Sequence, residues 1–263
     1  MTISLPMYGI NRHKVDNLWG RLREQLRRRG LENLPGVLCW PDPLLPHWRD
    51  PRLLLSQTCG YPLVTALPDV QVVGRFHYDA PGCGGGNYRS LLIVRASDPR
   101  ATLADFRQGI TACNSPDSHS GYNVLRFMVA PLSGHGRFFK QVLFTGAHVQ
   151  SLDAVRGGLA DITAVDCVTF ALLRRARPLA VKGLRVLAES PAAPGLPLIT
   201  AAATPPDVVA LLRAALAGLV AAPDGRRECA AVLIKGFSAA TREDYRAILH
   251  MRREAERLGV TAL

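Results

Sequence analysis

The sequence predicts an α/β protein of two lobes, each built on a doubly wound, mostly parallel sheet. Short apolar runs alternate with helical patterns along nearly the whole chain of 263 residues. The runs form two successive sets, separated by stretches rich in proline and small residues at 96–99 and 191–197. Because two chain crossings make a hinge, we expect lobe 1 to comprise residues 1–96 and 198–263, and lobe 2 residues 97–197.

The first set of elements opens with a strand and an amphipathic helix. Residues 2–8 form an apolar run typical of a strand. A helix is predicted over residues 14–29, where apolar residues recur on one face. Those residues are Val15, Leu18, Leu22 and Leu26. Short apolar runs bounded by turn residues predict further buried strands. They are residues 37–40, 53–56, 70–78 and 88–96.

The second set repeats this alternation. Helices are predicted to begin near Ser118, His148 and Asp166. The tail carries two long helical patterns, over residues 205–219 after a double proline and over residues 242–258. It has no strand pattern of its own, so we expect it to pack on lobe 1. The predicted strands of the second set are residues 110–113, 141–144, 162–165 and 184–188.

The formal net charge of +11 comes mostly from arginine and favours an anionic partner. It does not choose between phosphate, carboxylate and nucleic acid. Nucleic-acid binding is the weaker interpretation, because Glu24, Glu254 and Glu256 interrupt the basic clusters and predict solvated helix faces. No zinc-finger spacing and no set of RNA-stacking aromatics occurs. The six scattered cysteines lie in or beside apolar runs and predict buried, reduced thiols.

The chain as written shows no pattern of export or membrane insertion. Residues 1–8 are too short a run, broken by Pro6, for the apolar region of a secretory signal. No run is long and apolar enough to span a bilayer. From these patterns we expect a soluble monomer, cytoplasmic if Met1 is the natural start. The seven histidines show no pairing typical of a metal site, and we expect no cofactor.

A run of small polar side chains at residues 117–122 is the strongest candidate for a binding site. A helix that begins here presents unpaired backbone N–H groups, which together with serine hydroxyls suit a small anion. We expect Ser118 to cap the helix, Ser120 and His119 to face a ligand, and Gly121 to let the backbone come close. The alternative is that these residues cap an ordinary helix and bind nothing.

Other polar and aromatic side chains follow the predicted strands, where ligands of open α/β sheets collect. They include many neutral hydrogen-bond donors and few paired carboxylates, which suits holding a polar ligand better than transforming it. A protonated His148 would donate to an anion, and Asp166 would accept from a ligand or cap the next helix. Each aromatic side chain would either line the binding site of the ligand or belong to the hydrophobic core. The candidates are Tyr8, Trp40, Gln57, Thr58, Tyr61, Tyr78, His148, Ser151 and Asp166.

Several of these segments resemble one known family. The string Leu-Leu-Leu-Ser-Gln-Thr-Cys-Gly-Tyr-Pro-Leu at residues 53–63 is similar to the signature of the phosphonate-type (phosphate, phosphite, phosphonate) substrate-binding proteins of ABC transporters. That family has the type II periplasmic-binding fold. Departures from its pattern occur at His119, Ala147 and Thr163. The other matching segments are residues 5–8, 82–83, 88–90, 118–122 with Arg126, 145–148, 151–152, 161, 165–169 and 194–197.

The resemblance implies a solute receptor that is not an enzyme. Its two lobes would close on a small anionic, phosphonate- or phosphate-like ligand, with the anion at the Ser118 helix start. Gln57, Thr58 and Tyr61 would contribute from the opposite lobe. The resemblance further implies a periplasmic location and an ABC transporter permease as partner.

Two other functions stay open from the residues themselves. A cytosolic enzyme of this fold would need a covalent nucleophile, and the residue types offer Cys59 or Cys83. The corresponding base would be His77 or His148. A metabolite sensor would use the same cleft and pass its closure to a separate partner protein, since no helix-turn-helix is left over in the chain.

Overall fold

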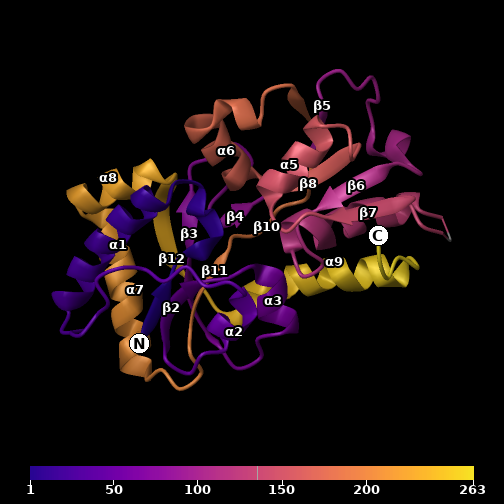
Figure 1. Cartoon of the computed structure of the whole chain (residues 1–263). Coiled ribbons are helices and arrows are strands. Elements are labelled where there is room, and N and C mark those ends of the chain that lie inside the picture. Colours follow the sequence, from indigo (N-terminus) through magenta and orange to yellow (C-terminus); the bar gives the residue numbers. More distant parts are fainter. Residues whose placement is uncertain (135) are drawn as a thin grey trace. The chain divides into compact units, whose positions relative to one another are not determined.

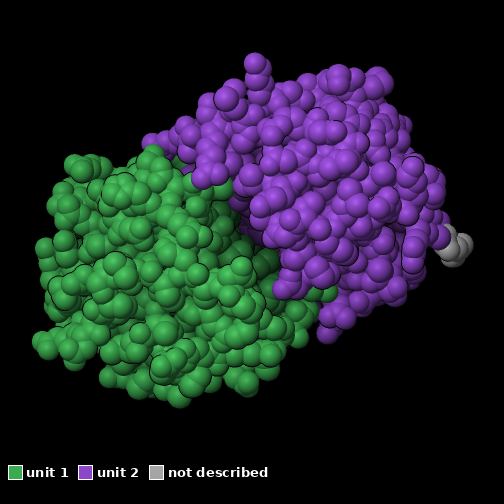
Figure 2. Space-filling view, viewed as in Figure 1, with its two compact units in different colours: residues 1–87, 194–245 green, residues 88–193, 246–263 purple. Residues whose placement is uncertain are grey.

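The chain folds into two α/β units, described by a computed structural model for residues 1–134 and 136–263 (Figure 1). Unit 1 comprises Met1–Asn87 and Pro194–Tyr245. Unit 2 comprises Tyr88–Ala193 and Arg246–Leu263, so each unit is assembled from two separate stretches of chain (Figure 2). The α/β class predicted from the alternating patterns is confirmed.

Unit 1 is built on a five-stranded sheet of order β1-β2-β11-β3-β12. Strands β1 and β2 run parallel, whereas β11 is antiparallel to both of its neighbours and β12 is antiparallel to β3. The sheet is therefore mixed and not mostly parallel as predicted. The strands are β1 (Thr2–Ser4), β2 (Leu53–Gln57), β3 (Gln71–Tyr78), β11 (Pro197–Thr200) and β12 (Ile234–Ala239).

The predicted amphipathic helix of unit 1 is confirmed as α1 (Arg12–Arg27). Its four predicted apolar residues are all buried, and the helix packs against α7 and α8. The other helical segments of unit 1 are short or lie in the tail. They are η1 (Pro6–Asn11), α2 (Leu44–Trp48), α3 (Gly60–Thr65), α7 (Pro206–Ala221), α8 (Pro223–Ala231) and η6 (Arg242–Tyr245).

Unit 2 is built on a second five-stranded sheet, of order β7-β6-β8-β5-β9. Strand β6 runs parallel to β7 and β8, while β5 is antiparallel to β8 and β9. Four strands thus point one way, so the predicted parallel character holds here except at β5. The strands are β5 (Ser90–Arg95), β6 (Ile110–Cys113), β7 (Gln141–Phe144), β8 (Ile162–Asp166) and β9 (Leu184–Glu189).

The helices of unit 2 begin where the sequence predicts. The starts near residues 118, 148 and 166 are confirmed by a turn at His119–Asn123 that continues into α4 (Val124–Val129), and by helices α5 and α6. The helical segments are η2 (Leu103–Phe106), η3 (His119–Asn123), η4 (Ala130–Leu132), α5 (His148–Arg156), α6 (Cys167–Ala176), η5 (Pro178–Ala180) and α9 (Arg246–Arg257). Two short strands, β4 (Asn87–Tyr88) and β10 (Ala193–Pro194), pair with each other where the chain passes between the units.

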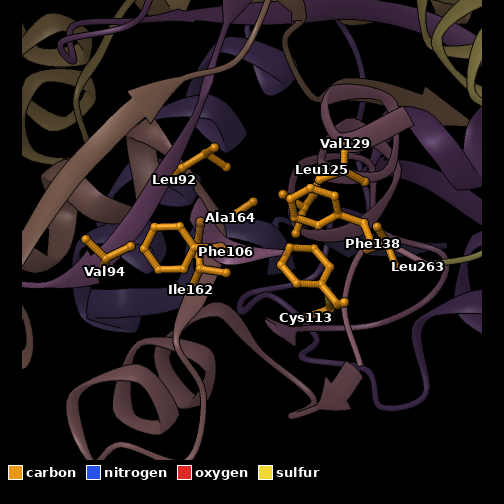
Figure 3. Packing of buried hydrophobic residues seen from close by; sticks show 11 residues of the cluster. Leu92, Val94, Phe106, Cys113, Leu125, Val129, Phe138, Ile162, Ala164 and Leu263 are labelled. Carbon is orange, nitrogen blue, oxygen red and sulfur yellow. The ribbon is translucent and has the colours of Figure 1, made fainter. Parts of the chain in front are cut away.

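The core of unit 2 joins the sheet to α4 and to the end of the chain (Figure 3). Leu92 and Ile162 come from the sheet, and Leu125 comes from α4. The rings of Phe138 and Phe139 pack edge to face with their centroids 4.8 Å apart. Leu263 lies in the same cluster, so the tail is part of this core.

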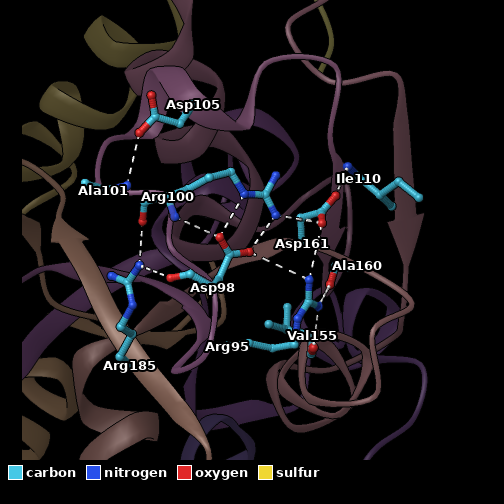
Figure 4. Close-up of polar contacts among 10 residues, drawn as sticks. All are labelled: Arg95, Asp98, Arg100, Ala101, Asp105, Ile110, Val155, Ala160, Asp161 and Arg185. Atoms are coloured by element: carbon cyan, nitrogen blue, oxygen red, sulfur yellow. Dashed lines mark hydrogen bonds and ion pairs between the residues drawn. The ribbon is translucent and has the colours of Figure 1, made fainter.

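A network of arginines and aspartates fastens the loops at one end of the unit 2 sheet (Figure 4). Asp98 accepts hydrogen bonds from Nε and Nη2 of Arg100, at 2.9 and 2.6 Å. Arg100 also donates to Asp161 at 2.9 Å, and Asp161 in turn accepts from the backbone N–H of Ile110 at 2.8 Å. The side-chain hydrogen bonds from Arg100 lower the pKa of Asp98 to about 2.

The tail and one strand belong to a different unit from the one expected. We predicted residues 88–96 and 246–258 in lobe 1, but β5 pairs with β8 and β9, and α9 packs against α4, all in unit 2. The break between Ala193 and Pro194 lies inside the predicted stretch 191–197.

Two predicted strands differ from the structure. The strand predicted over residues 2–8 ends at Ser4, because Pro6 opens the helical turn η1. The strand predicted at 37–40 is wrong: Val37 is exposed, and a backbone hydrogen bond from Cys39 to Ile3 does not extend into a ladder.

No single helix within the described residues has both the length and the apolar character to cross a membrane. Helices α7 and α8 satisfy both criteria only when taken together, and the chain bends by 86° between them.

Candidate functional site

The turn that opens α4 has the cap predicted for it. The Ser118 hydroxyl accepts a hydrogen bond from the backbone N–H of Gly121 at 3.1 Å, and the N–H of Asn123 reaches the Ser118 carbonyl at 3.0 Å. This turn, η3, is a single π-helical turn, and other side chains pack tightly around its Gly121. A Cβ there would lie 1.9 Å from Oδ1 of Asn114 and 3.1 Å from Cε1 of His148. Only glycine therefore fits at this point of the turn.

Three of the predicted side chains meet beside this turn. Oγ of Ser120 lies 3.0 Å from Nε2 of His148. The same nitrogen lies 3.5 Å from Oδ2 of Asp166. The other carboxylate oxygen of Asp166 accepts from the backbone N–H of Thr169 at 2.8 Å and so caps α6. The structure thus brings Ser120, His148 and Asp166 together, and Asp166 has the capping role that the sequence offered as its alternative.

The His148 imidazole is a poor base in this setting. Burial lowers the pKa of His148, and the nearby Asp166 carboxylate only partly opposes that effect. The protonated donor suggested by the sequence is therefore disfavoured, and the neutral ring is the form present near neutral pH.

Two buried polar atoms near the turn have no hydrogen-bond partner among the described residues. One is Nδ1 of His148, and the other is Oδ1 of Asn114. Buried polar groups are normally paired, and two unpaired atoms beside one turn favour a bound molecule as their missing partner. Asn114 directly follows β6, the position where ligands of α/β sheets gather and where the sequence also places it.

His119 is packed into unit 2. It is 1% exposed, its Nδ1 lies 3.2 Å from the amide nitrogen of Asn123, and its ring meets the edge of Tyr88. Burial lowers the pKa of His119 to about 4. These contacts hold the His119 ring against Asn123 and Tyr88, and a contact between His119 and a ligand stays a prediction.

Ser151 is also occupied by the protein. Its hydroxyl lies 2.6 Å from Oγ1 of Thr145 and 3.3 Å from the carbonyl oxygen of Ala147. Both contacts hold the start of α5, so a scaffold role accounts for the side chain.

In unit 1 three other predicted side chains lie together. The Gln57 amide donates to the Tyr78 hydroxyl at 3.1 Å, and the rings of Tyr8 and Tyr78 meet edge to face with centroids 5.0 Å apart. All three line a cavity of about 20 Å³, together with apolar side chains such as Leu5 and Phe76. That volume is about the size needed for one water molecule.

The remaining candidates of unit 1 are Thr58, Tyr61 and Trp40. Thr58 is buried, and its N–H donates to the carbonyl of Pro197 at 3.0 Å. Tyr61 is half-buried in the first turn of α3. The Arg12 guanidinium lies over the Trp40 ring, with Cζ of Arg12 4.7 Å from the ring centroid.

The contacts of His148 differ from those of a hydrolytic triad. In a Ser-His-Asp triad the carboxylate holds Nδ1 and the hydroxyl faces Nε2, whereas here Ser120 and Asp166 both face Nε2. The described part of the chain also contains no group of three or more His, Cys, Asp or Glu side chains placed to hold a metal ion, and His135 lies outside it.

Comparison with known proteins places these features in a family. The family described as "ABC transporter, phosphonate, periplasmic substrate-binding protein" matches residues 55–245. No curated protein matches the chain.

Solved structures share the fold. One is a binding protein component of an ABC phosphonate transporter (PA3383) from Pseudomonas aeruginosa, with 18% identity, a TM-score of 0.79, and coverage of 98% of this chain and 87% of that one. A second is PhnD1 from Prochlorococcus marinus in complex with methylphosphonate, with 15% identity, a TM-score of 0.74 and coverage of 97% of both chains. A third is XAC2383 from Xanthomonas citri bound to chloride, with 16% identity, a TM-score of 0.74 and coverage of 98% of both chains.

Proposed function

The chain belongs to the family of periplasmic substrate-binding proteins of phosphonate ABC transporters, and from this we propose that it captures a small phosphorus oxyanion at the turn that opens α4 in unit 2. Members of this family are solute-binding components of transporters and not enzymes. The family relation implies a small solute as ligand and an ABC permease as partner.

The observation that carries the proposal is the serine hydroxyl donor that the capped turn leaves available. Ser118 accepts from Gly121, which leaves the hydroxyl hydrogen of Ser118 free to point at an anion. The two buried atoms without partners, on His148 and Asn114, lie around the same glycine. Hydroxyl donors at the start of a helix suit a small oxyanion.

We propose the cluster of Tyr8, Gln57 and Tyr78 in unit 1 as a second binding region. Thr58 and Tyr61 follow Gln57 closely in the sequence, and the Trp40 ring lies against Gly9, the residue after Tyr8. Its support is chemical: an amide and two phenol groups offer neutral hydrogen bonds next to apolar walls. Such a lining suits the uncharged part of a small organic anion. We further propose that the protein acts as a monomer in the periplasm, to be checked by light scattering and by fractionation of the native host.

The proposal is tested by titration calorimetry and thermal unfolding against phosphate, phosphite, methylphosphonate, 2-aminoethylphosphonate and a set of carboxylates. A ligand at 100 times its Kd adds about 2.7 kcal/mol to the free energy of unfolding, enough to raise the Tm visibly. We expect binding by at least one phosphorus oxyanion and a loss of at least about tenfold in the double variant Ser118→Ala, Ser120→Ala.

Ser238→Ala is the matched control, because that serine contacts His77 in unit 1 and not the proposed turn. Unchanged affinity in the double variant would show that the anion binds elsewhere. Failure of every phosphorus oxyanion to bind would refute the proposed function.

A further inference from the structure

The arrangement around His148 determines which ring nitrogen carries the proton. Nε2 faces the hydroxyl of Ser120 and the carboxylate of Asp166. A carboxylate only accepts hydrogen bonds, so a lone pair on Nε2 would point at negative charge. The proton of the neutral ring therefore lies on Nε2.

This tautomer also sets the direction of the Ser120 hydroxyl. Because Nε2–H is the donor, Oγ of Ser120 accepts from it at 3.0 Å and keeps its own hydrogen for a ligand. Asp166 acts here as a positioning residue, since it holds the tautomer and touches no ligand in this scheme.

The other ring nitrogen of His148, Nδ1, is then a hydrogen-bond acceptor that no donor among the described residues contacts. Nδ1 of His148 is buried, has no partner among the described residues, and carries a lone pair. Oδ1 of Asn114, which lies on the same side of Gly121 as the His148 ring, is a second acceptor in the same condition. A fully ionised anion placed here would bring a third set of lone pairs to this point, and that arrangement costs free energy unless a proton lies between them.

The other groups around His148 do not supply that proton. Asp166, at the end of β8, is the charged group that acts on the ring, while the turn contributes the neutral Ser120 and the end of β6 the neutral Asn114. Burial lowers the pKa of His148 in the unliganded protein, so the proton arrives with the ligand or from solvent during binding.

We propose, resting on the proposed function, that the anion binds together with one proton held between an anion oxygen and Nδ1 of His148. The site then prefers phosphorus oxyanions to sulfonates. A phosphoryl oxygen takes up a proton near neutral pH, with a second pKa of about 6 in phosphate esters. Sulfonates of the same shape remain unprotonated, so their binding requires a charged His148 in a buried site.

The test is titration calorimetry of the intact protein with methylphosphonate at about pH 8.5, above the second ionisation of such groups, in buffers of different ionisation enthalpy. The slope of observed enthalpy against buffer enthalpy counts the protons taken up. We expect one proton per bound methylphosphonate, and at least about tenfold weaker binding of methanesulfonate. In His148→Gln, which cannot hold a proton, we expect no proton uptake and a smaller difference between the two ligands.

His77→Gln is the matched control, since His77 contacts Ser238 in unit 1, and its proton uptake should stay at one. Tight binding by the natural protein without proton uptake would overturn the inference and leave the proposed function intact. So would uptake of one proton in His148→Gln, because the proton would then lie on another group. If His148→Gln bound methylphosphonate more weakly but still took up one proton, His148 would have only a structural role, and the inference would be overturned.

A second measurement needs no variant. Nitrogen NMR of ring-labelled histidine reports each tautomer directly. We expect the proton on Nε2 of His148 in the free protein, and a shift of Nδ1 towards its hydrogen-bonded or protonated value when methylphosphonate binds. An unchanged Nδ1 signal at saturation would overturn the inference, and no binding of any phosphorus oxyanion would refute the proposed function as well.

Discussion

At the scale of single residues, neighbouring positions of similar chemistry have very different roles. Thr111 and Thr163 both lie fully buried in adjacent strands of unit 2. Thr111 donates to the carbonyl of Ile162 at 3.1 Å, whereas Oγ1 of Thr163 has no partner among the described residues. A buried hydroxyl without a partner retains the cost of its lost hydration, so Thr163 lowers the stability of the sheet.

Replacing that hydroxyl by a methyl group should stabilise the protein. We expect Thr163→Val to raise the free energy of unfolding by about 1 kcal/mol, because the shape is kept and the unpaired group is removed. Thr111→Val should lower it by about 1 kcal/mol, since that change removes a made bond. Urea unfolding of both variants measures the two effects, and a destabilised Thr163→Val would show that its hydroxyl is hydrogen-bonded in solution.

At the scale of elements, apolar periodicity predicts a helix well and a strand's partner poorly. The spacing of Val15 to Leu26 identified α1, because a helix makes its own hydrogen bonds. The run at residues 88–96 identified a strand but not its unit, since β5 is placed by pairing with β8 and β9, far away in the chain. The strand predicted at residues 37–40 does not form. Val37 is apolar but exposed, and an apolar residue without a neighbouring strand to pair with does not make a strand.

The site, like the fold, was predictable where it depends on residues close together in the sequence. Residue type was enough to predict the Ser118 cap, because capping depends on neighbours within one turn. Which of His119 and Ser120 contacts His148 depends on the π-helical geometry of that turn, and the sequence does not report it. The resemblance of residues 53–63 to a family predicted more of the fold than apolar periodicity did. A family's fold includes strand pairings between residues far apart in the chain, which periodicity does not report.

The Arg–Asp network should make unit 2 sensitive to acid. The pKa of Asp98 is about 2 in the folded protein against 3.8 for the free group, so its stabilisation is full above about pH 4 and is lost as the pH falls through 2. We expect Asp98→Asn to lower the free energy of unfolding by about 2 kcal/mol at pH 7 and by less than about 0.5 kcal/mol at pH 2, where the folded protein holds this carboxyl half protonated.

Urea unfolding between pH 7 and pH 2 measures that difference. Asp153→Asn, at an exposed pair with Arg156, is the control and should change stability by less than about 0.5 kcal/mol. A deficit in Asp98→Asn that persists unchanged at pH 2 would assign the effect to packing and not to charge.

At the scale of the whole molecule, the charge of +11 acts on the rate of capture. A positive field concentrates anions near the surface and raises the association rate constant, and salt screens that field. We expect the association rate constant for a dianionic phosphonate to fall several-fold between about 0.01 and 0.15 M salt.

Stopped-flow tryptophan fluorescence at each salt concentration separates the two rate constants. The dissociation rate constant should change by less than about twofold, because the bound anion is held by short-range contacts. If salt instead raised the dissociation rate with no change in association, exposed charges would be direct contacts of the ligand.

The two-part make-up of unit 2 has a consequence for anyone who wishes to express it separately. Leu263 lies in the main core, and Ala255 and Val260 cover Ala130 in a second cluster. A gene fragment for residues 88–193 would leave both apolar faces bare and favour inclusion bodies. A spliced gene that joins Ala193 to Arg246 through a short glycine-rich linker restores the missing segment, and it offers an isolated domain for NMR titration of the anion.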